Sequence, residues 1–257
     1  MVKAGRAFAI ESTPIATNAQ VFGGLITGQQ GGNCLPLGQG GSFSNSSLGN
    51  SVAAFRGNKP GKGVTADLAL LNNFNAGAGT LDVTADINQG GAASSFANVA
   101  GTYAVSSTGH TQVNFTDPNT GKQDTFTLYL DGNGNWYALI PDKSISLGFG
   151  EPQAAGPFNN SSIGGTYAFE SEFIPEGATA VKSDEMTVDN TKLTLTASNG
   201  VSGGYAMDAS GSGRGTATMT SGIPFGSKGA VLYVVNANRF VAMGTTATAP
   251  VVVLLIQ

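Results

Sequence analysis

Charged residues are scarce in this chain. Of its 257 residues, 12 are Lys or Arg and 16 are Asp or Glu, a charged fraction of 11%. An ordinary soluble domain has about 25%. Long surface helices draw heavily on Glu, Lys and Arg, so this composition excludes a helical bundle or a coiled coil. The apolar fraction of 40% is too high for a disordered chain. A folded, turn-rich β protein remains.

Histidine, cysteine and basic runs are almost absent as well. The single histidine, His110, and the single cysteine, Cys34, exclude an internal disulfide and the common transition-metal sites within one copy. Without a run of Lys and Arg, a nucleic-acid partner is not expected. No apolar run reaches the ~18 residues of a membrane-spanning helix, and no signal peptide opens the sequence. We expect no cofactor and no membrane span.

What the chain has in excess is glycine, at 38 positions, between short alternating runs of apolar and small polar residues. Period-two alternation rich in Thr and Val is typical of strands with one buried face. Hairpin signals such as Asp131-Gly132 and Asn199-Gly200 separate these runs. The pattern predicts antiparallel β structure with very little helix.

Four short patterns recur in the same order, at offsets between 102 and 115 residues. Phe43-Ser-Asn-Ser-Ser-Leu-Gly49 returns at 158–164, and Gly101-Thr-Tyr-Ala104 returns as Gly204-Tyr-Ala206. Leu128-Tyr-Leu130 and Trp136-Tyr-Ala-Leu139 return at 232–234 and 240–243. The repetition predicts two copies of a β unit of about 100 residues.

We therefore expect an N-terminal hairpin in residues 1–42, related to the end of a preceding repeat, then β units at 43–153 and 154–257. Each unit has room for seven or eight strands at the usual spacing. Short connections favour an antiparallel meander, and closure removes its two open edges. A small up-and-down barrel is the favoured architecture, and a sandwich is the alternative.

The order of these motifs resembles a known type of repeat. Phe-x-Asn-Ser-Ser with a following Gly-x-Tyr-Ala, closed by Glu151-Pro-Gln153, is similar to tandem β repeats of large, poorly characterised predicted surface proteins of acidobacteria. The resemblance covers residues 43–257 and departs at 50–55, where the usual aromatic residue is missing, and at the chain end. It implies an extracytoplasmic setting and transfers no active-site residue.

One candidate metal site stands out. Asp131, Asn133 and Asn135 place oxygen ligands at alternating positions, as a calcium loop does. Trp136, however, occupies the position where such a loop needs glycine, and no glutamate closes the cage. A β-turn explains the same residues and is the preferred interpretation.

Catalytic patterns are weaker still. Gly200-Val-Ser-Gly-Gly204 matches a nucleophile elbow, but no helix pattern follows it and His110 comes earlier in the chain. Glu170 and Glu172 share one strand face, which is better explained by solvation than by acid–base chemistry. We expect no enzymatic activity.

The sequence therefore predicts a non-catalytic, secreted or cell-surface structural or adhesive protein. Its expected partners are other surface components or a second copy, joined head to tail into fibres by strand addition. The residues assigned to that assembly are Phe8, Ile10, Val251, Val253 and Leu255. The alternative is a barrel that binds a carbohydrate or another small ligand.

Overall fold

The computed structural model describes residues 7–10, 23–26, 42–59, 63–132, 134–141, 145–172, 184–221, 225–248, 250 and 252–257. Most of them lie in antiparallel strands, and the described helical structure consists of two single 3₁₀ turns, η1 (Asn45–Ser47) and η2 (Asn160–Ser162). The all-β prediction is confirmed.

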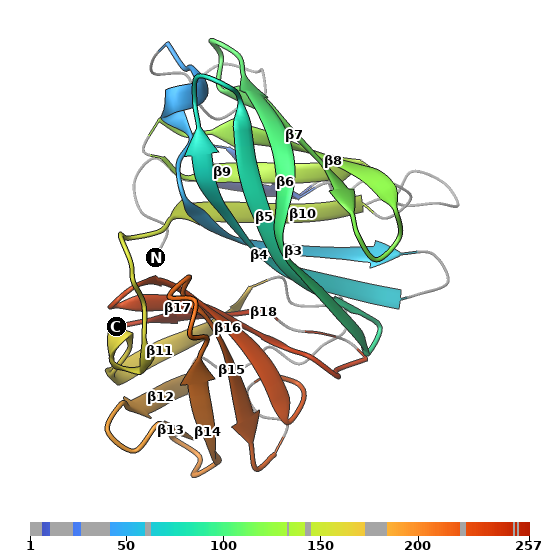
Figure 1. Ribbon diagram of the computed structural model, residues 1–257. Coiled ribbons are helices and arrows are strands. Elements are labelled where there is room, and N and C mark those ends of the chain that lie inside the picture. The colour runs from blue at the N-terminus through green and yellow to red at the C-terminus, as the bar shows by residue number, and fades with distance from the viewer. Residues whose placement is uncertain are drawn as a thin grey trace.

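The strands form two closed eight-stranded barrels in tandem (Figure 1). In each barrel sequence neighbours pair in order and the last strand returns to the first, so both are up-and-down meanders. The barrel architecture is therefore confirmed over the sandwich. The first barrel contains β3 (Ser51–Lys59), β4 (Gly63–Asn75), β5 (Thr80–Gln89), β6 (Ala92–Val105), β7 (His110–Asp117), β8 (Lys122–Leu130), β9 (Trp136–Pro141) and β10 (Ile145–Pro152).

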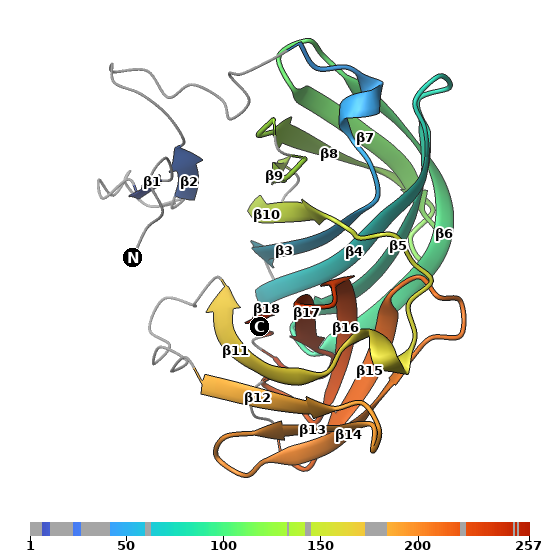
Figure 2. The ribbon, with the colours of Figure 1, turned by 90° about the vertical axis from the view of Figure 1, so that its left-hand side faces the viewer.

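The second barrel contains β11 (Gly165–Glu172), β12 (Asp184–Asp189), β13 (Thr194–Ala197), β14 (Ser202–Met207), β15 (Arg214–Met219), β16 (Gly229–Asn236), β17 (Arg239–Gly244) and β18 (Val252–Ile256). The boundary drawn from sequence after residue 153 falls between β10 and η2. Outside both barrels, β1 (Ala7–Ile10) and β2 (Gly23–Ile26) pair with each other as a two-stranded sheet (Figure 2).

Alternation decides which side chains enter each barrel. In β15, Ala217 and Met219 are buried while Thr216 and Thr218 are exposed, as period-two patterning predicts. An eight-stranded barrel is just wide enough for its own side chains to fill it. The second barrel's interior is filled by apolar residues from every strand, including Tyr167, Phe169, Leu195, Leu232, Phe240 and Leu255.

The first barrel fills the matching part of its core with side chains of different sizes. Gly150 on β10 pairs with Trp136 and Ala53, whereas Leu255 on β18 pairs with Phe240 and Phe169. A Cβ at Gly150 would lie 2.0 Å from Trp136 Cε2, so the indole occupies the space of the missing side chain. Trp136 is completely buried. The indole also packs against Phe55 of β3, with ring centroids 6.1 Å apart.

Each barrel is closed at one end by the repeated Phe-x-Asn-Ser-Ser segment. Asn45 Oδ1 accepts a hydrogen bond from the backbone N–H of Val105 at 2.9 Å, and Asn160 Oδ1 accepts one from Met207 at 2.7 Å. The hydroxyl of Tyr103 donates to the Asn45 carbonyl at 3.1 Å. The hydroxyl of Tyr205 donates to the Asn160 carbonyl at 2.7 Å.

Two of the repeated sequence patterns therefore meet as one contact in both barrels, and we call this contact the clasp. Beside it, Phe43 and Phe158 are each 8% exposed and belong to the two barrel cores. The same four hydrogen-bonding partners recur at matched positions in both units. This agreement supports the prediction of tandem repeat units at the level of individual atoms.

We predict that Gly150→Ala lowers the free energy of unfolding by about 1–3 kcal/mol, because the added methyl group must displace a fully buried indole. The measurement is chemical denaturation followed by circular dichroism. Gly49→Ala is the matched control, since a Cβ at Gly49 meets nothing within 4 Å. Equal losses in the two variants would contradict the packing argument.

Candidate functional site: the seam between the barrels

The two barrels pack through their outer walls, in a contact that we call the seam. Strands β3 and β4 of the first barrel lie against β16, β17 and β18 of the second (Figure 2). Their outward side chains form the apolar part of the seam. These residues are Val52, Ala54, Ala66, Leu68, Leu70, Val231, Tyr233, Val235, Val241, Met243, Val252 and Leu254. All of them are buried.

The seam explains the continuous apolar runs of the second barrel. In β16, Leu232 and Val234 face the barrel interior while Val231 and Val235 face the first barrel. A strand buried on both faces reads as an unbroken hydrophobic run instead of an alternating one. The same division holds for the apolar run at 252–255.

This arrangement corrects the assembly role assigned to the chain's last strand. Val253 and Leu255 point into the second barrel and are 0% exposed. Strand β18 pairs with β11 on one edge and with β17 on the other, so it cannot accept a further strand. Phe8 and Ile10 lie in β1, where they pair with Leu25 and Gly23. The side chains of Phe8 and Ile10, and all of Val251, lie outside the described residues.

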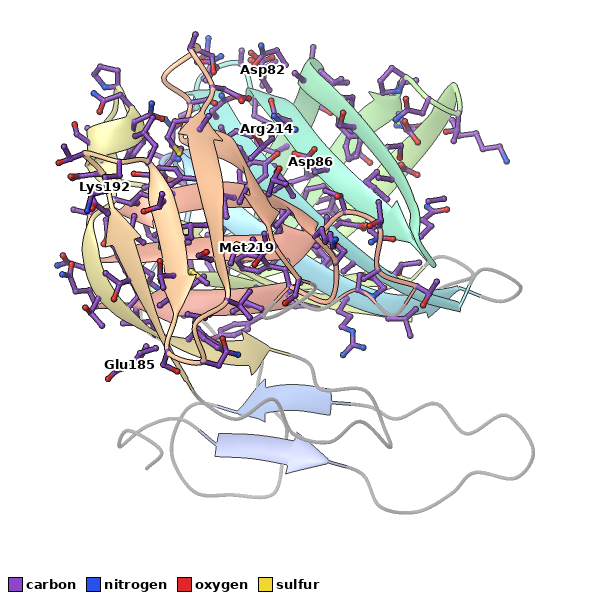
Figure 3. All side chains as sticks on the ribbon, turned by 90° about the horizontal axis from the view of Figure 1, so that it is seen from below. Asp82, Asp86, Glu185, Lys192, Arg214 and Met219 are labelled. Atoms are coloured by element: carbon purple, nitrogen blue, oxygen red, sulfur yellow. The ribbon has the colours of Figure 1, made fainter. Side chains whose placement is uncertain are left out.

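At the polar end of the seam, one carboxylate from the first barrel receives three hydrogen bonds from the second. Figure 3 labels the carboxylate, Asp86, and one of its partners, Arg214. Arg214 on β15 holds Asp86 on β5 through Nε and Nη2, both at 2.7 Å. The hydroxyl of Tyr233 donates to Asp86 Oδ2, also at 2.7 Å. Arg214 Nη1 donates to Asp208 at 2.8 Å. The fork geometry of the guanidinium makes this a directional contact.

Burial and charge act together on these groups. The hydrogen bonds from Arg214 to Asp86 raise the pKa of the guanidinium, against the opposing effect of burial. Burial raises the pKa of Tyr233 well above its ordinary value, and the negative charge of Asp86 raises it further. The phenol therefore stays protonated and keeps its role as a donor.

The segment that links the two barrels also contacts the second barrel directly. Glu151 forms an ion pair with Arg239 of β17. Gln153 Nε2 donates to the carbonyls of Ser212 at 2.9 Å and Val234 at 2.8 Å. The backbone N–H of Ala154 donates to the Val235 carbonyl at 2.8 Å. The Glu-Pro-Gln motif at 151–153 is thus a clamp between the two units.

A buried amide completes the polar contacts. Asn88 on β5 is 0% exposed and donates through Nδ2 to the carbonyls of Gly244 at 2.7 Å and Ala247 at 3.1 Å. Because a buried polar group is costly unless it is hydrogen-bonded, these contacts fix one relative placement of the barrels. The seam thus positions the two barrels relative to each other. Its buried carboxylate, Asp86, already accepts three hydrogen bonds.

The calcium candidate is a tight turn between β8 and β9. The backbone N–H of Asp131 donates to the Asn135 carbonyl at 3.0 Å, and Asn135 Nδ2 donates to Asp131 Oδ2 at 2.8 Å. Asn133 lies outside the described residues. Among the described residues, no group of three or more His, Cys, Asp or Glu side chains is arranged to hold a metal ion.

The remaining sequence candidates are not brought together. The ring of His110 packs against Tyr129 on the outer wall of the first barrel, with centroids 5.3 Å apart. Ser202 begins strand β14 and pairs with Thr196, instead of standing on a strand-to-helix turn. The side chains of Glu170 and Glu172 lie outside the described part of the chain, as does Cys34.

Sequence reasoning missed the Asp86–Arg214 pair completely. The two residues are 128 positions apart and belong to different repeat units. Asp86 falls at a regular polar position of its alternating strand, which also carries Asp82, so it did not stand out in the sequence. Nothing local indicated its partner.

We found no family model that matches the chain, and no curated protein or solved structure that matches it either. The resemblance to acidobacterial surface repeats therefore stays a prediction. The described residues contain no helix long and apolar enough to cross a membrane.

We predict that Asp86→Ala destabilises the protein by about 3 kcal/mol, because it leaves the buried phenol of Tyr233 without its acceptor and the half-buried guanidinium of Arg214 with Asp208 alone. Asp208→Ala is the matched control. It removes the other carboxylate bound to Arg214, whose side chain is 36% exposed against 9% for Asp86. A loss of about 1 kcal/mol or less is expected there. Denaturant titration measures both, and similar losses would refute the central role of Asp86.

The seam should also weaken at high pH. The folded-state pKa of Tyr233 is raised above the ordinary value of 10.0, so its stabilisation is complete below about pH 10 and is lost as the pH rises further. Unfolding measured between pH 8 and 11 should show falling stability above about pH 10, with a smaller fall in Tyr233→Phe. Tyr129→Phe, on the far outer wall, should retain the full fall.

Proposed function

We propose that this protein is a non-catalytic structural and adhesive module of the cell surface or the secreted fraction. The observation that carries the proposal is the seam, which joins two filled barrels through apolar, ionic and linker contacts. Such a pair acts as a stiff spacer that keeps surfaces on its two barrels at a constant separation. An interface between flexibly linked domains is usually more polar than this apolar contact.

The composition supports an extracellular setting. A chain in which only 11% of the residues are charged is compatible with a protein that binds through surface contact and not through electrostatic steering. The predicted likeness to repeats of bacterial surface proteins points the same way. Each barrel has a core of apolar side chains drawn from its own strands.

Self-association is a second candidate activity, as a two-fold dimer in place of the head-to-tail fibre expected from the sequence. Both barrels close without β1 and β2, which form their own two-stranded sheet. An isolated hairpin is at best marginally stable, so pairing with a second hairpin would stabilise it. The closed barrels provide no complementary edge among their described strands, so the hairpin of a second copy is the fitting partner. That contact is two-fold and closes as a dimer, in place of a fibre.

The rigid-spacer proposal predicts one narrow distance between the barrels. Spin labels at Ala104 on β6 and Thr187 on β12, both exposed, with Cys34→Ser, should give a single narrow distance distribution. Asp86→Ala combined with Gln153→Ala should broaden it, because the ionic contact and the linker clamp are both removed. A broad distribution in the parent protein would refute the proposal.

Association through the hairpin predicts a dependence on residues 1–42. Sedimentation of the full chain should show a dimer at high concentration, while a chain beginning at Phe43 should remain monomeric, because it retains both barrels and lacks β1 and β2. Identical monomers from both proteins would exclude hairpin pairing. Larger polymers that survive the truncation would also exclude it.

A further inference from the structure

A depression of about 540 Å³ lies on the outer wall of the first barrel, away from the seam. We call it the outer trough. It crosses β4 to β8 and is lined by Asn73, Thr80, Leu81, Asp82, Ala100, Gly101, Thr102, Asn114, Phe115, Thr116 and Gln123. Its volume falls in the range of small-ligand sites, about 300–1,000 Å³.

The strand register explains why the wall is hollow there. Ala100 pairs with Asp82, and Thr102 pairs with both Thr80 and Asn114. These side chains point outward because their neighbours Leu81 and Tyr103 point into the barrel. The methyl group of Ala100 is the small floor, and longer polar side chains stand around it. Glycine at position 101 lets strands β6 and β7 approach closely, since a Cβ there would lie 2.9 Å from the Asn114 carbonyl oxygen.

The rim offers donors and acceptors in fixed positions. Asn73 Nδ2 donates to Asp82 Oδ2 at 2.8 Å, and Thr125 donates to Asn114 Oδ1 at 2.7 Å. These bonds hold the orientation of a carboxylate and an amide. The other carboxylate oxygen of Asp82 can therefore accept a hydrogen bond from a ligand, and the amide nitrogen of Asn114 can donate one. Groups held on a rigid sheet lose little freedom on binding.

The second barrel provides an internal comparison. By strand register, Thr196 occupies the position of Asp82, Thr218 that of Asn114, and Ser202 that of Ala100. At these three matched positions the second wall has hydroxyl side chains in place of the carboxylate, the amide and the methyl group. The clasp is common to both units, whereas the trough's chemistry belongs to the first.

We propose that the outer trough binds a neutral, hydroxyl-rich glycan. Sugar hydroxyls both donate and accept, which matches a rim of amides, hydroxyls and one carboxylate. The C–H face of a sugar ring fits the apolar floor of Ala100 and Gly101. Asp82 is the one ionisable side chain in the lining, which favours an uncharged ligand over an anion or a divalent cation. This inference rests on the adhesive part of the proposed function and supplies its partner class.

The test uses the full chain and three soluble probes, cellohexaose, xylohexaose and maltohexaose, in millimolar titrations followed by ¹H–¹⁵N NMR. Saturable shifts at the backbone amides of Asp82, Ala100 and Asn114 are expected with at least one probe. Asp82→Ala and Asn114→Ala should each weaken binding about tenfold or more, as expected when a hydrogen bond to a charged or fixed group is lost. Thr196→Ala, at the matched position of the second barrel, should leave binding unchanged.

No saturable shift with any of the three probes would overturn the inference. Binding that persists in both trough variants, or that shifts amides of the second barrel instead, would overturn it as well. Spectra of the unliganded variants show whether each remains folded, and using two independent variants keeps the test decisive if one does not. The inter-barrel distance measurement is separate, so failure of the spacer and failure of glycan binding are distinguishable.

Discussion

Strands β16 and β18 bury both of their faces, one inside the second barrel and the other against the first. This double burial holds the two barrels against each other. Each barrel satisfies its own backbone hydrogen bonds, and the seam joins the two into a single body. Separating them would expose the apolar outer side chains of β16, β17 and β18 to water. Closure of the second barrel also removes β18 from the set of strands that could pair with another molecule.

Polar groups then select one arrangement of that apolar contact. Hydrophobic burial alone tolerates sliding, since it depends on area and has little directionality. The polar contacts do not tolerate sliding. The oxygens of Asp86 must meet a planar guanidinium and a phenol, and the amide of Asn88 must meet two carbonyls. With Gln153 holding the linker, the separation of the barrels' outer walls becomes a property of the fold. Such a fixed separation suits a module that acts by contact.

The two units show which parts of a repeat can diverge. The clasp of asparagine and tyrosine is the same in both, because it satisfies backbone groups at a barrel end and has few chemical substitutes. The core packing differs, because only the total volume has to be conserved. Trp136 over Gly150 and Phe240 beside Leu255 fill equivalent space. The outer wall differs as well, since the first unit carries Asp82 and Asn114 where the second has Thr196 and Thr218.

Much of the fold followed from local patterning. Alternation, glycine turns and the recurring motifs were sufficient to predict two β units and their closure into barrels, because strand period and edge satisfaction are local or topological constraints. The same reasoning assigned the apolar run at 251–256 to assembly, since a sequence shows that a run is apolar but not what covers it. The sequence alone determined the strands, the repeat and the meander. Only the tertiary structure decided that Val253 and Leu255 face a core, that Asp86 meets Arg214, and that a trough surrounds Ala100, because each depends on which distant residues the curvature of closed sheets brings together.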